Sequence, residues 1–415
     1  YLSVDYSWCS AIRGTYGAAP RGGKTLYDLT DGTKMFPFVY VAGGTWTVNF
    51  GQQPFNYTPP SGFKKINTFN LPDSTIEDGS EHFDTALWTG NGSASGPTVS
   101  SLEFKPQFIW SKRRDSAANN YIYDTVRSNS DSPNKFLNTN NTDAEQTFNA
   151  FTLADNGFTL ATDNVYFNAS GGTYVSWNWN TAGYGSSNTD GTIGTSTVSA
   201  NTTAGFSVGT YSGDGTDANK TVGHGLGVVP EMVIVKPRDE ARHWLIWHKD
   251  FNDYDKALLF NIDTVGDNRF GPNAPTTTVF GAYGGQGNRS TTDFVFYAFA
   301  GVEGFSKFGS YIGNASTDGP FIYTGFRPAF VMTKGIDQNK NWDLYDSART
   351  PNNEIGSTLS ADNNGAEYVA PVYNAMDFYS NGFKLRNNNS TNNNNGSQFL
   401  YMAFAENPFK NSNAR

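Results

Sequence analysis

The chain has 415 residues, more than one hydrophobic core usually serves, and this length predicts roughly two to four domains. Charged residues make up only 16% of the sequence and aromatic residues 15%, with 44 glycines and 18 prolines, which disfavours long surface helices and favours strands joined by tight turns. The net charge of −9 argues against nucleic-acid binding, and no window reaches the roughly 20 apolar residues that insertion into a membrane requires. We therefore expect an all-β protein.

The first 80 residues carry two aromatic runs, KTLYDLTDGTKMFPFVYVAGG at 24–44 and WTVNFGQQPF at 46–55. The second run resembles the last strand of a SPRY domain, and the first resembles the strands and turn before it. SPRY domains are β-sandwiches that commonly bind other proteins. Because the space suits only the C-terminal half of such a domain, the resemblance implies a partial SPRY-like β segment at 1–80.

The rest of the chain contains an internal repeat in three copies. Each copy has a proline, an apolar run and a lysine six residues after the proline, at 106–112 (PQFIWSK), 230–236 (PEMVIVK) and 328–334 (PAFVMTK). An aromatic residue with a Gly turn precedes each proline, an aromatic strand follows it, and the copies end in GGTYVSWNW, TTDFVFYAFA and GSQFLYMAFA. A unit of about 100 residues has the size of a whole β-sandwich.

These spacings define the expected domains. We predict β-sandwich repeats at 81–183, 205–304 and 305–410, followed by a short tail at 411–415. Residues 184–204 are rich in Ser, Thr, Gly and Asn, which predicts a linker, whereas the second and third repeats join directly and should pack as a rigid pair. The expected architecture is a series of tandem, jelly-roll-like β-sandwiches in an elongated chain.

The histidines suggest no metal site. His243 and His248 are five residues apart, so on a strand they point to opposite faces, and we assign them polar cross-strand or turn roles. Asp124 and Asp346 stand where His248 does in the other copies. His224 lies in a glycine-rich turn before a strand, and His82 has no visible partner in the sequence.

The acidic residues suggest no catalytic pair. Glycoside hydrolysis needs two carboxyl groups at a fixed separation, but Asp124, Asp250, Glu303 and Asp346 are single acids in separate parts of the chain. The loop that begins at Asp214 has the oxygen ligands that calcium prefers, although such turns are more often only turns. We predict no catalytic residue, no metal ligand and no cofactor, and therefore no enzymatic activity.

Two groups of residues could contact a sugar. Five tryptophans lie in recurring strands, which favours a place in the core or at a subunit interface: Trp177, Trp179, Trp244, Trp247 and Trp342. An uncharged loop at 387–396 is the better candidate for an exposed binding surface, with a passive solvated loop as the alternative. Its asparagines are Asn387, Asn388, Asn389, Asn392, Asn393, Asn394 and Asn395.

The arrangement as a whole resembles long β-rich virion proteins of marine and environmental bacteriophages. The most specific signatures are WTVNFGQQPF, TVGHGLGVVPEMVIVK, EGFSKFGSY and FAENPFK. Such proteins are usually assigned to tails or tail fibres, so the resemblance implies a structural protein of the virion, assembled in the host cytoplasm, that contributes to host attachment.

The resemblance also implies partners. It points to self-association into a homo-oligomer, a trimer by analogy with fibres, to other virion proteins and to a host-surface glycan. The alternatives are a carbohydrate-binding adhesin or lectin-like module and, behind it, a polysaccharide depolymerase.

Overall fold

The computed structural model describes residues 75–406 except 217, 218, 252, 264–267, 272 and 370–374. The chain divides into two compact units, Tyr1–Pro72 and Asp73–Arg415. Nearly all of the predicted SPRY-like segment at 1–80, and the tail at 411–415, lie outside the described residues. The regular secondary structure of the described residues is almost entirely antiparallel β-sheet, which confirms the predicted all-β sandwich fold.

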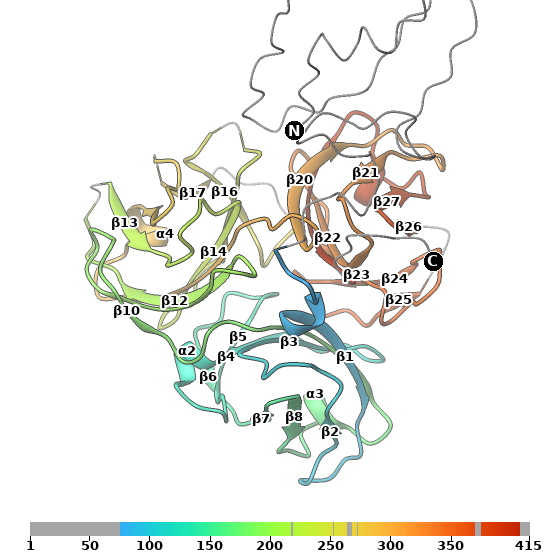
Figure 1. Cartoon of the computed structure of the whole chain (residues 1–415), viewed down its shortest axis with the longest axis horizontal. Helices are drawn as coiled ribbons and strands as arrows, with labels where there is room; N and C mark the ends of the chain where they lie inside the picture. The colour runs from blue at the N-terminus through green and yellow to red at the C-terminus, as the bar shows by residue number, and fades with distance from the viewer. Residues whose placement is uncertain are drawn as a thin grey trace, which may run out of the picture. The chain divides into compact units, whose positions relative to one another are not determined.

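Repeat 1 (79–183) is a sandwich of a six-stranded and a three-stranded sheet, drawn in blue to green in Figure 1. In sheet order, the larger sheet consists of β1 (Phe83–Thr89), β9 (Thr173–Trp179), β3 (Phe108–Arg113), β4 (Asn120–Asp124), β5 (Lys135–Asn138) and β6 (Gln146–Thr147). The smaller sheet consists of β2 (Thr98–Val99), β8 (Gly157–Leu160) and β7 (Phe151–Ala154). The short helices are η2 (Gly79–Glu81), α2 (Thr125–Ser128) and α3 (Val165–Asn168).

Repeat 2 (186–300) has the same central strand order with two added strands at one edge. Its larger sheet consists of β10 (Ser186–Asn188), β11 (Ser196–Asn201), β12 (Phe206–Ser212), β19 (Asp293–Phe299), β14 (Met232–Pro237), β15 (Leu245–His248), β16 (Lys256–Leu259) and β17 (Asn268–Arg269). The smaller sheet pairs β13 (Lys220–Gly223) with β18 (Val279–Ala282), and α4 (Gly284–Gly287) precedes the last strand.

Repeat 3 (305–406) repeats the topology of repeat 1. Its larger sheet consists of β20 (Ser306–Ile312), β28 (Gln398–Ala405), β22 (Pro328–Gly335), β23 (Asp343–Asp346), β24 (Ser357–Ser360) and β25 (Tyr368–Val369). The smaller sheet consists of β21 (Phe321–Tyr323), β27 (Gly382–Leu385) and β26 (Met376–Tyr379), and α5 (Ser390–Asn393) precedes the last strand. No helix in the described part of the chain is long and apolar enough to cross a membrane.

The segment at 184–204 is not a linker. It contains β10 and β11, and β11 pairs antiparallel with β12 through residues such as Val198 opposite Gly209. Thr and Val have branched side chains that suit a strand, and the backbone hydrogen bonds of a ladder do not depend on apolar composition. A judgement based on composition alone therefore missed two strands of repeat 2.

The larger sheets are buried on both faces. In β3, Ile109 packs into the core that repeat 1 makes with its own smaller sheet, while Phe108 and Trp110 belong to a second core shared by the three repeats. In β9, Tyr174 likewise belongs to the core of repeat 1, and Val175 belongs to the shared core. Because side chains alternate along a strand, each larger sheet joins an outer sandwich core to a common inner core.

Equivalent aromatic residues from the three repeats meet in the inner core. Trp179, Phe299 and Phe404 occupy the same position in β9, β19 and β28. Their ring centroids are 6.4 Å apart for Trp179 and Phe299, 5.4 Å for Trp179 and Phe404, and 6.3 Å for Phe299 and Phe404. Each repeat therefore touches both of the others.

The contacts between repeats follow one another in a closed ring. In each repeat, a residue at the start of β4, β15 or β23 donates a side-chain hydrogen bond to a neighbouring repeat. The acceptor is the last carbonyl of β24, β5 or β16, each of which lies next to the edge strand of its sheet. The three bonds run from Asn120 to Ser360 (3.0 Å), from Trp244 to Asn138 (2.9 Å) and from Trp342 to Leu259 (3.0 Å). Residues 73–415 are thus one compact unit with a pseudo-threefold order of contacts, which differs from the expected elongated chain of modules.

Candidate functional site

The asparagine-rich loop at 387–396 is largely built into repeat 3. Asn387, Asn392 and Asn393 are buried, Asn389 and Asn394 are half-buried, and Asn388 and Asn395 are exposed. The expectation of an exposed loop is therefore wrong for Asn387, Asn392 and Asn393, because the amides of Asn387 and Asn393 bond backbone groups and that of Asn392 donates to the Tyr345 hydroxyl. The Asn393 side chain, for example, donates to the Ser316 carbonyl at 2.9 Å and accepts from the Asn314 amide at 2.9 Å.

The same buried asparagine recurs in every repeat. Asn168, Asn288 and Asn393 each stand five residues before the last strand of their repeat. Their side-chain oxygens accept the backbone N–H of Asn91 at 2.7 Å, Asp214 at 2.9 Å and Asn314 at 2.9 Å, respectively. The asparagine therefore holds the Gly turn that follows the first strand, and its constant spacing from the last strand was the sequence signal for this role.

Two of the histidines have structural partners that the sequence did not reveal. His82, for which the sequence offered no partner, lies 3.1 Å from the Asn201 amide through its Nδ1 atom. His224 is buried, and its Nε2 atom lies 3.1 Å from the carbonyl of Thr276. His82 therefore ties a turn to β11, and His224 ties two loops to one another.

No metal site is present in the described residues. His243 lies within hydrogen-bond distance of Asn261, whereas His248 is buried at the end of β15. Asp214 forms an ion pair with Lys220 at 2.9 Å, and Asp217 lies outside the described residues. Within those residues, no group of three or more His, Cys, Asp or Glu side chains is placed to hold a metal ion.

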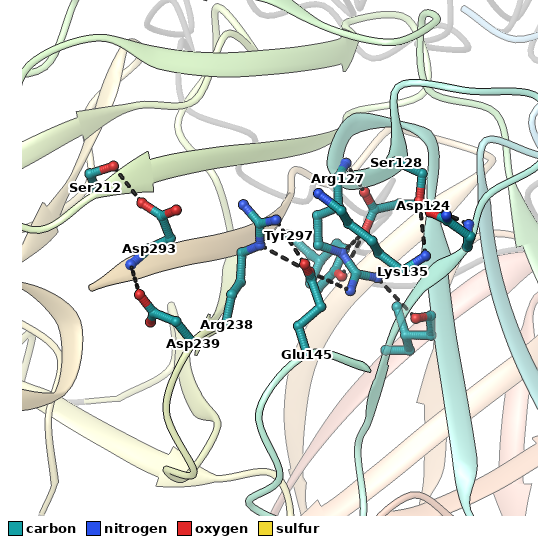
Figure 2. Close-up of polar contacts among 12 residues, drawn as sticks. Asp124, Arg127, Ser128, Lys135, Glu145, Ser212, Arg238, Asp239, Asp293 and Tyr297 are labelled. Atoms are coloured by element: carbon teal, nitrogen blue, oxygen red, sulfur yellow. Dashed lines mark hydrogen bonds and ion pairs between the residues drawn. The ribbon is translucent and has the colours of Figure 1, made fainter. Parts of the chain in front are cut away.

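A buried network of charged side chains joins repeat 1 to repeat 2 (Figure 2). Asp124 caps α2 and forms an ion pair with Arg127, and neither side chain is exposed to solvent. Arg127 also contacts Glu145 at 3.2 Å, and Arg238 from repeat 2 binds Glu145 at 2.8 Å. The hydroxyl of Tyr297, also from repeat 2, donates to Asp124 at 3.0 Å. Burial alone would raise the pKa of Glu145, but the guanidinium groups of Arg238 and Arg127 hold it below its usual value.

The same network joins repeat 3 to repeat 1. Asp346 binds Arg349, whose guanidinium lies 3.5 Å from Glu367, and both Asp346 and Arg349 are fully shielded from solvent. Arg114 from repeat 1 binds Glu367 at 2.6 Å, and the indole N–H of Trp177 donates to Asp346 at 3.0 Å. Each residue of this network stands at the same position in its repeat as one residue of the first network. The residue types also agree, except that Trp177 stands where the first network has Tyr297.

At the interface between repeats 2 and 3, one histidine and three apolar residues occupy four of the five matching positions, and the fifth position, Asp267, lies outside the described residues. His248 replaces the aspartate, Phe251 the first arginine, Ile336 the second arginine, and Met402 the tyrosine or tryptophan. A cavity of about 10 Å³ lies beside His248 and Met402, and the His248 Nε2 atom has no hydrogen-bond partner within the described residues. Burial lowers the pKa of His248 to about 4.

Asp124 and Asp346, the buried acids among the four candidates, are not paired with one another. Asp124 and Asp346 lie in different interfaces, and an arginine three residues further along the chain neutralises each of them. Asp250 is half-buried, and Glu303 is exposed in the turn between repeats 2 and 3. The chemistry that these groups perform is therefore the neutralisation of one buried charge by another.

The three lysines of the repeated proline-to-lysine runs are also buried. Lys112, Lys236 and Lys334 all have fully buried side chains that donate to backbone carbonyls, for example from Lys236 to Pro237 at 2.7 Å. Burial lowers the pKa of Lys112 to about 7 and the pKa values of Lys236 and Lys334 to about 8. Their recurrence at one position in all repeats indicates a role in folding of the unit.

All five tryptophans considered for sugar stacking are buried, as the sequence favoured. They are Trp177, Trp179, Trp244, Trp247 and Trp342. Since their faces are covered by other side chains, none offers a platform to a ligand.

A groove that the sequence did not reveal lies on repeat 1 beside a loop of repeat 3. It has a volume of about 450 Å³. Its lining combines aromatic rings and amides, and Asn364 is its contribution from repeat 3. The lining residues are Ala117, Ala118, Asn119, Tyr121, Phe136, Asn138, Asp143, Gln146, Thr147, Phe148, Asn164, Tyr166, Phe167 and Asn364.

Residues 78–408 match a protein family described as a domain of unknown function (DUF7483), and the chain belongs to this family. The match covers all three repeats and begins and ends close to their outer boundaries. The family therefore corresponds to the whole ring of repeats and not to one sandwich. No curated protein and no solved structure matches the chain.

Proposed function

We propose that this chain is a structural protein of a bacteriophage tail, tail fibre or similar virion appendage, which contributes to host attachment and has no catalytic activity. The observation that carries the proposal is the use of the buried charges. The acids and arginines with the most buried side chains, Asp124 with Arg127 and Asp346 with Arg349, join repeats to one another. The resemblance of the sequence to phage virion proteins supplies the biological setting.

The acids at the charged interfaces between repeats favour this role over a depolymerase. Hydrolysis of a glycosidic bond requires two carboxyl groups about 5–10 Å apart around the substrate, one of them protonated. The arginine partners instead keep Glu145 and Glu367 below their usual pKa, which is the opposite of what a general acid needs. Glutamates that arginines keep ionised at the contacts between repeats support a structural role for the chain.

The ring of repeats also suits a virion part. Contacts between different faces of neighbouring units close into rings in many symmetric oligomers, and here one chain supplies all three units. We propose that further self-association, with a trimer as the expected state, and contacts with other virion proteins use outer surfaces. Repeat 3 offers exposed apolar side chains for this purpose: Ile312, Phe321, Tyr323 and Tyr379.

The proposal is tested on purified virus particles from the sample whose DNA encodes this chain. Peptides of the chain should be found in the particles by mass spectrometry, and antibodies against the full chain should label an appendage in electron micrographs. Absence of the chain from the particles would contradict the virion role. Release of reducing sugar ends from bacterial polysaccharides by the purified chain would contradict the absence of catalysis.

A further inference from the structure

The groove on repeat 1 carries side chains that the repeated fold does not require. In the strand register, Tyr121 and Phe136 correspond to Leu245 and Ala257 in repeat 2 and to Asp343 and Thr358 in repeat 3. Tyr166 stands two residues before the shared buried asparagine, where repeat 2 has Gln286 and repeat 3 has Thr391. Since the other repeats fold without aromatic residues at these positions, the rings of repeat 1 need another explanation.

The aromatic rings form a continuous apolar surface with one exposed end. The ring centroids of Tyr121 lie 5.5 Å from Phe136, 4.7 Å from Phe167 and 6.1 Å from Tyr166. Tyr166 is 47% exposed, although tyrosine usually buries most of its ring. Tyr121, Phe136 and Phe167 are buried, so Tyr166 is the ring of this cluster that can receive the flat apolar face of a ligand.

Amide side chains surround the rings. The side-chain oxygens of Asn119 and Asn164 accept bonds within the fold, but the described residues supply no acceptor for their amide N–H groups. Asn138 is only 3% exposed, yet its side-chain oxygen has no hydrogen-bond partner among those residues. Buried amide oxygens are normally satisfied, so this one indicates a ligand hydroxyl or a water molecule in the groove.

The groove carries almost no charge. Asp143 is its one charged lining residue, and no lysine, arginine or histidine belongs to the lining. An anionic ligand would meet this carboxylate without a cation to balance it, while a cationic ligand would find a single exposed partner. Rings together with amides, and without a cation, suit a polar but neutral ligand with apolar faces and many hydroxyl groups.

We propose that this groove binds a short neutral oligosaccharide, with a sugar ring stacked on Tyr166 and its hydroxyls bonded by Asn119, Asn138 and Asn164. The volume of about 450 Å³ lies within the range of roughly 300–1,000 Å³ that is typical of small-ligand sites. The biological meaning of the site rests on the proposed attachment role, because many copies of a weak sugar site on one particle give avidity for a cell surface.

The test is isothermal titration of the full chain with neutral tetrasaccharides, namely cello-, malto-, manno- and chitotetraose, and with tetragalacturonate as the anionic counterpart. At least one neutral sugar should bind, and Tyr166→Ala should weaken that binding by about tenfold or more, whereas Asn119→Ala should have a smaller effect. The matched control is Tyr254→Ala, which removes a tyrosine that is 50% exposed on repeat 2. It should leave the affinity unchanged, and all variants should keep the melting temperature of the unaltered chain.

Three results would overturn the inference. These are the absence of binding to every neutral sugar tested, tighter binding of tetragalacturonate than of any neutral sugar, and equal losses of affinity in Tyr166→Ala and Tyr254→Ala. The result is independent of the test on virus particles. Binding that Tyr166→Ala abolishes, by a chain absent from particles, would keep this site and remove the virion role; a chain present in particles without sugar binding would do the reverse.

Discussion

Repeat 1 meets both of its neighbours through buried ion pairs, whereas repeats 2 and 3 carry one histidine and three apolar side chains at four of the same five positions. Asp124, Arg127 and Glu145 face Arg238 across one interface. Asp346, Arg349 and Glu367 face Arg114 across another. The third interface has His248, Phe251, Ile336 and Met402 at four of the five matching positions, and the fifth, Asp267, lies outside the described residues. One scaffold therefore tolerates two chemically different ways of closing the same contact.

This difference explains how three similar sandwiches can assemble in one defined order around the ring. Each interface joins two different faces. We call the face that carries Asp124 in repeat 1 the aspartate-type face, and the face that carries Arg238 in repeat 2 the arginine-type face. Repeats 1 and 3 have the charged form of the first face, and repeats 1 and 2 have the charged form of the second. If repeat 3 took the place of repeat 2 beside repeat 1, Ile336 would replace Arg238 and leave Glu145 short of one cation. Mismatched charges thus disfavour the wrong order.

Removal of one buried cation should have the largest effect. Arg127→Met should lower the free energy of unfolding by about 3–5 kcal/mol, because Asp124 and Glu145 would stay buried without it. The measurement is denaturant unfolding followed by far-UV circular dichroism. The control is Arg242→Met, which removes a partner of Glu240 from a half-exposed pair and should cost less than about 1 kcal/mol. Similar losses in both variants would show that burial of the network does not matter.

The apolar interface should be the acid-sensitive one. Burial lowers the pKa of His248 from 6.5 to about 4, so between these pH values the unfolded chain binds a proton that the folded chain does not. Stability therefore falls as the pH drops through this window. In His248→Leu this loss should be absent. The free energy of unfolding of the variant, relative to that of the unaltered chain, should therefore rise by roughly 3 kcal/mol as the pH falls from 6.5 to 4.

The measurement is the free energy of unfolding of both chains at half-unit steps of pH. Glu145 and Glu367 have lowered pKa values, so the charged interfaces keep their stabilising carboxylates down to more acidic conditions than an isolated glutamate would. A constant difference between the two chains across the window would mean that His248 is already protonated in the folded protein.

Loss of a single hydrogen bond to a buried charge should have a smaller effect. Tyr297→Phe removes only the hydroxyl that donates to Asp124 at 3.0 Å, and should cost about 2 kcal/mol because the acceptor is a buried carboxylate. The matched change in the apolar interface is Met402→Leu, which alters shape without a hydrogen bond and should cost less than about 1.5 kcal/mol. Denaturant unfolding of both variants provides the comparison, and a larger loss for Met402→Leu would contradict it.

The sequence predicted the elements whose signal recurs in each copy. The repeated strands, the burial of the tryptophans and the equivalence of Asp124, His248 and Asp346 all follow from local patterns at constant spacing. By contrast, Glu145 and Arg238 are 93 residues apart, and Arg114 and Glu367 are 253 residues apart. No local pattern connects such partners, so the ring of interfaces became visible only with the fold.

The predictions of an exposed asparagine loop and of a linker were wrong for a related reason. Polar composition predicted exposure of Asn393 and a linker at 184–204, but an amide can be buried when it satisfies backbone groups, and a Ser/Thr-rich segment can complete a sheet. The groove depends on Tyr121, Phe136 and Tyr166, which come from two strands and a helical turn. Each residue alone looks like ordinary core, and only their convergence indicates a site.

The smallest effect is expected from exchange of one kind of interface for the other. A variant with apolar residues at all five positions of the first network should have a free energy of unfolding within about 1 kcal/mol of the unaltered chain, because no buried charge is left unpaired. The substitutions are Asp124→Leu, Arg127→Phe, Glu145→Leu, Arg238→Ile and Tyr297→Met. The measurement is the same denaturant unfolding used for Arg127→Met.

This exchange separates stability from order. If ion pairs serve mainly to exclude wrong neighbours, the five-residue variant should be stable but should lose part of its near-UV circular dichroism signal, since repeats 2 and 3 would then compete for the place beside repeat 1. A variant as unstable as Arg127→Met would instead mean that the charged network itself supplies the stability of the contact. In that case the apolar interface between repeats 2 and 3, with its small cavity beside His248, would be the weakest of the three contacts and the first to open.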